Sequence, residues 1–146
     1  PYQLRLVATD GAGNSTTQSV DIDIDGTPPT VRIDQPTADR LLGQRFDVMG
    51  QVADAHLLDY RIAVATAAQP NDWVDLAIGN AAVTGLLGAL DVQQRQGPLR
   101  LRLTATDRAG LSASVERAIR VDSEAPDAPT GLTAVVLQNR DVRLNW

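Results

Sequence analysis

The chain has 146 residues, a net charge of −5 at neutral pH and no cysteine. The absence of cysteine excludes a disulfide framework and a thiolate metal site, and the negative charge argues against a partner that presents a phosphate backbone. Every apolar run falls short of the roughly 20 residues that a membrane-spanning helix needs. We therefore expect neither nucleic-acid binding nor membrane insertion.

The first element along the chain is one copy of an internal repeat. Residues 1–29 align without a gap on residues 98–126, and 13 of these 29 positions are identical. A period of about 100 residues with a strand-like pattern predicts tandem β domains, and hence a piece of a longer protein. Three parts are predicted: residues 1–25 are the last two strands of one module, residues 26–123 are a complete module, and residues 124–146 are a linker and the first two strands of a third.

Five short strands are predicted between the two copies of the repeat. Glycine, proline and asparagine separate apolar segments of strand length in this region. The predicted strands cover residues 30–33, 46–52, 58–64, 73–78 and 83–90. The last of them is rich in leucine and alanine and would also suit a short helix. On the third strand we expect an inward face made of Leu58, Tyr60, Ile62 and Val64.

The second copy of the repeat has the clearest strand pattern. Apolar residues occupy every second position from Leu99 to Ala105, which is typical of a half-buried antiparallel strand. A turn at residues 107–110 leads into a return strand whose inward face runs from Val115 to Val121. Arg117 interrupts that face, and this predicts a bulge or a strand end.

Seven short strands in about 98 residues indicate an all-β fold, an immunoglobulin-like sandwich. The segments YRIAV (residues 60–64) and LRLTATDRAG (residues 101–110) resemble bacterial immunoglobulin-like and fibronectin type III-like modules. The tail APDAPTGLTAVVLQNRDVRLNW is similar to the opening of a fibronectin type III domain, with Pro129 at its entry and Trp146 as the core tryptophan. The resemblance implies one complete module flanked by two partial ones, in a large secreted or surface-anchored bacterial protein.

The string from Asp21 to Gly26 copies the first half of an EF-hand calcium loop. The second half departs from it, because the twelfth position is Arg32 and prolines interrupt the loop. Alternate residues of a strand also lie about 6.6 Å apart, whereas ligands of one Ca²⁺ must lie within about 2.5 Å of it. We therefore expect no EF-hand.

Four aspartates, Asp25 at the end of this string and three from the complete module, are candidate ligands at the junction between the modules. The topology of such a sandwich would place Asp54, Asp59 and Asp107 near Asp25, which ends the preceding strand. Several carboxylates suit Ca²⁺, and the resemblance also implies a calcium-stiffened junction. For Asp107 the alternative is a cap of the D-x-A-G turn, in which the carboxylate accepts a backbone N–H. Both interpretations stay open at this point.

Catalysis is not expected. His56 is the only histidine and falls in a predicted loop, so a nucleophile–base pair or a zinc site is hard to assemble. Trp73 is expected to pack in the core, the alternative being an exposed ring.

These observations predict a non-catalytic stalk segment in adhesion or surface assembly, located outside the cell or on its surface. Its partners would be neighbouring modules of the same chain and a cell-surface or matrix ligand. The alternative is an ancillary spacer of a secreted enzyme or YD-repeat-type toxin. A third interpretation is ligand binding by the loops of the complete module, for which an exposed Trp73 would be the signal.

Overall fold

The computed structural model describes residues 2–43, 45–92, 95–128, 130–138 and 140–145. Within these residues the chain forms β-strands and no helix. This part of the chain therefore contains no helix long and apolar enough to cross a membrane. The prediction of an all-β fold is confirmed.

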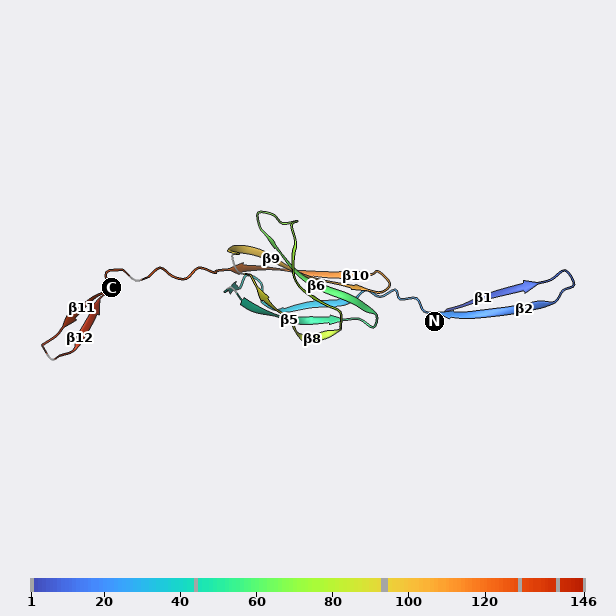
Figure 1. Cartoon of the computed structure of the whole chain (residues 1–146), viewed down its shortest axis with the longest axis horizontal. Helices are drawn as coiled ribbons and strands as arrows, with labels where there is room; N and C mark the ends of the chain where they lie inside the picture. The colour runs from blue at the N-terminus through green and yellow to red at the C-terminus, as the bar shows by residue number, and fades with distance from the viewer. Residues whose placement is uncertain (1, 44, 93–94, 129, 139, 146) are drawn as a thin grey trace.

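The middle of the chain folds into a sandwich of two sheets (Figure 1). The larger sheet has the order β4 (Leu41–Leu42), β10 (Ser112–Val121), β9 (Gly97–Asp107), β6 (Leu57–Thr66) and β7 (Val74–Gly79). The smaller sheet has the order β3 (Thr30–Gln35), β5 (Arg45–Ala53) and β8 (Val83–Asp91). Residues 83–90, for which a helix was the alternative, therefore lie in a strand.

One hydrophobic core fills the space between the two sheets. Val48 and Val52 of β5 face Leu101 and Leu103 of β9, and all four side chains are fully buried. Burial of such a side chain contributes about 1.5–3 kcal/mol relative to leaving it exposed. The alternation predicted along residues 99–105 is confirmed, since each apolar position there is buried while the intervening residues are only half-buried.

A bulge shifts the start of β6 by one residue. The register between β6 and β9 changes between Leu57 and Asp59. As a result Leu57 is buried and Leu58 is 51% exposed, so the predicted inward position of Leu58 is wrong. The period-two pattern cannot reveal an extra residue that flips the side chains before it to the other face.

Arg117 lies within an unbroken strand rather than at a bulge. The β9–β10 register runs without interruption from Ser112 to Val121, so the predicted bulge or strand end at Arg117 is wrong. The half-buried guanidinium donates a hydrogen bond of 2.6 Å to the carbonyl oxygen of Ile33 on β3. Arginine can therefore occupy the inward face here, because its head group reaches from β10 to a carbonyl oxygen of β3 in the other sheet.

The chain enters and leaves the sandwich at opposite ends (Figure 1). This follows from the parallel pairing of β4 with β10, through Leu41 with Arg120 and Leu42 with Val121. Before the sandwich lies a hairpin of β1 (Tyr2–Thr9) and β2 (Ser15–Ile22), and after it a hairpin of β11 (Thr133–Val136) and β12 (Val142–Asn145). Pro129 and Trp146 lie outside the described residues, so the predicted core tryptophan of a third module stays a prediction.

Candidate functional site

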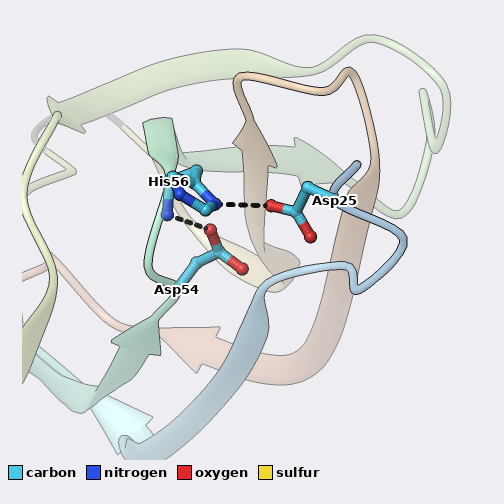
Figure 2. A group of neighbouring side chains, drawn as sticks. All are labelled: Asp25, Asp54 and His56. Carbon is cyan, nitrogen blue, oxygen red and sulfur yellow. Dashed lines mark hydrogen bonds and ion pairs between the residues drawn. The ribbon is translucent and has the colours of Figure 1, made fainter. Parts of the chain in front are cut away.

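The linker between β2 and β3 touches the sandwich at Asp25. One carboxylate oxygen of Asp25, Oδ1, accepts the backbone N–H of Thr27 at 3.0 Å, which closes an Asx-turn just before the two prolines of the linker. The other oxygen, Oδ2, lies 2.9 Å from Nδ1 of His56 (Figure 2). The Asx-turn therefore orients the carboxylate of Asp25, and the contact with His56 joins the linker to the loop between β5 and β6.

That loop holds His56 in place from two sides. Oδ1 of Asp54 accepts the backbone N–H of His56 at 2.7 Å. The carbonyl oxygen of His56 accepts the backbone N–H of Arg108, in the turn between β9 and β10, at 2.9 Å. Because both backbone groups of His56 are bound, the ring is presented toward the linker by a fixed loop.

Asp25, Asp54 and His56 form one compact group of potential ligands, which we call the junction cluster. One ligand atom from each residue lies within 4.8 Å of the other two. The cluster lines an open hollow of about 580 Å³, which Thr27, Pro28 and Ala82 also border. The imidazole is about half exposed and the carboxylate of Asp25 is 19% exposed. A small ligand could therefore reach the cluster from solvent.

The charges of the cluster reinforce its contacts. The hydrogen bond with Asp25 raises the pKa of His56, and the nearby charges of Asp25, Asp23 and Asp54 act in the same direction. The pKa of Asp25 is lowered, chiefly by the backbone N–H of Thr27 and then by His56. When His56 is protonated, its contact with ionised Asp25 is a charge-assisted hydrogen bond that solvent partly screens.

The four aspartates predicted as calcium ligands have different surroundings. The structure brings Asp25 and Asp54 together, and the other two lie outside the junction cluster. Asp59 lies 3.5 Å from the guanidinium of Arg61. Asp107 is fully buried and its Oδ1 accepts the backbone N–H of Leu111 at 2.8 Å, which is the turn cap considered as the alternative. No ion is needed to account for that contact.

His56 is the member of the cluster that sequence reasoning left out. The sequence places His56 in a predicted loop and, because it is the only histidine, assigns it no catalytic or zinc-binding role. The signal for it lies in the same argument that placed Asp54 at the junction, since His56 follows Asp54 by two residues in the same loop. In contrast, Asp21 of the EF-hand-like string lies exposed on β2 and accepts a hydrogen bond from Gln3, as a strand residue should.

Trp73 lies outside the hydrophobic core, so its predicted core position is wrong. The half-buried ring precedes β7 and is stacked against arginines of β9. The guanidinium of Arg102 is 3.8 Å from the ring centroid and that of Arg100 is 5.4 Å away. These cation–π contacts hold the ring of Trp73 against the outer face of the larger sheet.

Comparison with known proteins identifies no family for this chain. No family model matches it, and no curated protein matches it. It is similar to the crystal structure of an engineered protein, with 20% sequence identity and a TM-score of 0.47. The match covers 64% of this chain, and the chain spans only 20% of the length of that protein. A similarity of this size identifies neither a family nor a function.

Proposed function

We propose that this chain is a non-catalytic spacer segment of a large extracellular protein built from tandem immunoglobulin-like modules. The observation that carries the proposal is the polarity of the sandwich, which receives the chain at one end and releases it at the other (Figure 1). A module of this kind adds its full length to a row of modules. A sandwich whose termini lie at the same end would fold the row back on itself.

The order of the strands supports the immunoglobulin-like part of the proposal. A sheet of β3, β5 and β8 packs on a sheet in which β9 lies between β10 and β6. In an immunoglobulin-like or fibronectin type III-like module, strands A, B and E form one sheet and strands G, F and C form the other. β3, β5 and β8 take the places of A, B and E, and β6, β9 and β10 take those of C, F and G.

The junction supports a stiff spacer rather than a flexible one. Pro28 and Pro29 fix their own φ angles, and the side chain of Pro29 is buried. Upstream of them, the contact between Asp25 and His56 ties the linker to a loop of the sandwich. A linker held at both positions transmits orientation from one module to the next. Calcium at this junction stays a prediction from the sequence.

The proposal is tested first by where the sandwich resides. Antibodies raised against residues 30–121 should label intact, unpermeabilised cells of the source organism or its culture medium. Labelling that requires permeabilisation would contradict an extracellular role.

A replacement experiment separates spacing from recognition. In the parent protein, residues 30–121 are exchanged for an unrelated sandwich of similar length with termini at opposite ends, and in a second variant they are deleted. We expect the exchange to preserve the activity of the parent at the cell surface and the deletion to reduce it. Loss of activity in the exchange would assign ligand recognition to this sandwich and overturn the spacer role.

A further inference from the structure

We propose that the junction cluster binds a divalent cation of the zinc class, through Nδ1 of His56 and one carboxylate oxygen each of Asp25 and Asp54. The ion would cross-link the incoming linker to the loop between β5 and β6. Its role as a stiffener rests on the proposed function, whereas the binding itself depends only on the cluster.

The donor set selects the class of ion. Ca²⁺ takes six to eight oxygen ligands, whereas the cluster offers one imidazole nitrogen and two carboxylates. Zinc is bound by both imidazole nitrogen and carboxylate oxygen, and accessible zinc sites combine three protein ligands with an open fourth position. The open hollow at the cluster leaves that position to water. A histidine therefore makes this cluster different from a group of acidic residues alone.

One pair of ligand atoms already has the spacing that the ion needs, and the carboxylate of Asp54, within 4.8 Å of both, would move in to complete the site. Bonds from zinc to imidazole nitrogen and carboxylate oxygen are about 2.0–2.2 Å long. Two ligands at that distance lie about 3 Å apart at a right angle and about 3.4 Å apart at the tetrahedral angle. The present separation between His56 Nδ1 and Asp25 Oδ2 is 2.9 Å. On binding, the ion takes the place of the proton between these two atoms. From the imidazolium that proton goes to solvent, and from the neutral ring it moves to Nε2.

The surrounding charges set the strength of the site. Two carboxylates balance the charge of a divalent ion, and Asp23 borders a neighbouring hollow beside Asp25 and His56. Arg108 borders the same hollow and opposes a cation. One carboxylate oxygen of Asp54 accepts the backbone N–H of His56. The other oxygen is left for the ion, so binding of the ion leaves the fold of the loop intact. We expect a reversible site of moderate affinity rather than one that the fold requires.

Calorimetric titration of the full 146-residue chain, prepared without a histidine tag, tests the proposal. We expect one Zn²⁺ per chain, and the preference for zinc should persist in an excess of Ca²⁺. His56→Ala and Asp25→Asn should each weaken binding at least about tenfold, since even the loss of an outer-shell partner costs 10–100-fold. The matched control is Asp59→Asn, which removes a carboxylate outside the cluster and should bind as the wild type does. Thermal unfolding of each variant without metal checks that it is folded.

Three outcomes would overturn the proposal. They are no heat of binding, binding that His56→Ala leaves unchanged, and Ca²⁺ displacing Zn²⁺ at comparable concentration. A second measurement reports on the ligand atom directly: the ¹⁵N resonance of His56 Nδ1 should shift on addition of Zn²⁺, and an unchanged resonance would also contradict the site. Failure of these tests leaves the replacement experiment on the parent protein unaffected, so the two proposals can fail separately.

Discussion

The hairpins β1–β2 and β9–β10 have nearly the same local structure in two different environments. Their residue pairing is the same position for position, from Tyr2 with Ile22 to Thr9 with Ser15 in the first hairpin. Gly13 and Gly110 adopt φ angles of 89° and 88° in the two turns. The hairpin is therefore determined by local sequence, through the strand alternation and a turn that places glycine where φ is positive.

Burial is what differs between the hairpins. Leu103 is 0% exposed because the smaller sheet covers its face of β9, whereas the equivalent Leu6 is 71% exposed. The same alternation of residues thus gives both copies an apolar face, and among the residues that the structure describes only the second copy has an opposing sheet.

The turns differ in the hydrogen bonds that the side chain of the turn aspartate accepts. In the first hairpin both carboxylate oxygens of Asp10 are bound, because Asn14 donates its side-chain amide to Oδ2 at 2.8 Å. The equivalent of Asn14 in the second hairpin is Leu111. Oδ2 of Asp107 is consequently buried with no hydrogen-bond partner among the described residues. A buried acceptor in this state costs about 1–3 kcal/mol.

The largest expected effect on stability comes from the difference in burial between the two hairpins. Leu103→Ala should lower the free energy of unfolding of the sandwich by about 2–5 kcal/mol, because it leaves a cavity in the core. Leu6→Ala should change it by less than about 0.5 kcal/mol, because the side chain is exposed. Urea denaturation of the full chain measures both. An effect of Leu6→Ala as large as that of Leu103→Ala would mean that the first hairpin packs against the sandwich.

A smaller effect is expected from repairing the second turn. Leu111→Asn supplies Asp107 with the amide that Asp10 already has, whereas Leu111→Ala removes the same half-buried side chain without adding a donor. The asparagine variant should be more stable than the alanine variant by about 1–3 kcal/mol, measured by the same denaturation. Equal stabilities would show that Oδ2 of Asp107 is satisfied by a buried water or an ion.

The smallest effect is expected from the reverse exchange in the first turn. The pKa of Asp10 is lowered, first by the side-chain amide of Asn14 and then by the backbone N–H of the same residue. Its ionised form therefore supports the turn above the ordinary aspartate pKa, and that support is lost as the pH falls through the lowered value. Asn14→Leu should move the pKa of Asp10 back up toward its ordinary value. Carboxyl ¹³C titration by NMR measures the shift, and an unchanged pKa would show that the side chain of Asn14 does not lower the pKa of Asp10.

The sequence predicts those parts of the fold that depend on short-range pattern. Alternating apolar residues place β9 and β10 correctly, and the separation of apolar segments by turn residues predicts β3, β5 and β7. The exceptions require long-range information. The bulge before Tyr60 moves Leu58 to the surface, and Arg117 is accommodated only because the carbonyl oxygen of Ile33 lies within its reach.

The sequence predicts where the junction cluster lies, but not which side chains form it. Loop adjacency in a sandwich is enough to bring Asp25 near Asp54. The same reasoning cannot distinguish which loop side chains face the linker, because that depends on backbone hydrogen bonds that fix the loop, such as the one from Arg108 to His56. Asp59 was also expected at the junction, but it lies on β6, where its carboxylate is near the guanidinium of Arg61.

The stiffness of the proposed spacer depends on the contact between Asp25 and His56, which fixes the linker to the sandwich. Backbone ¹⁵N relaxation of the full chain in EDTA tests it most directly, through the order parameters of Asp25 and Thr27. We expect values near about 0.85, as in the strands of the sandwich, and a fall below about 0.6 in His56→Ala. Low values in the wild-type chain, or high values that persist in His56→Ala, would contradict a junction held by this contact.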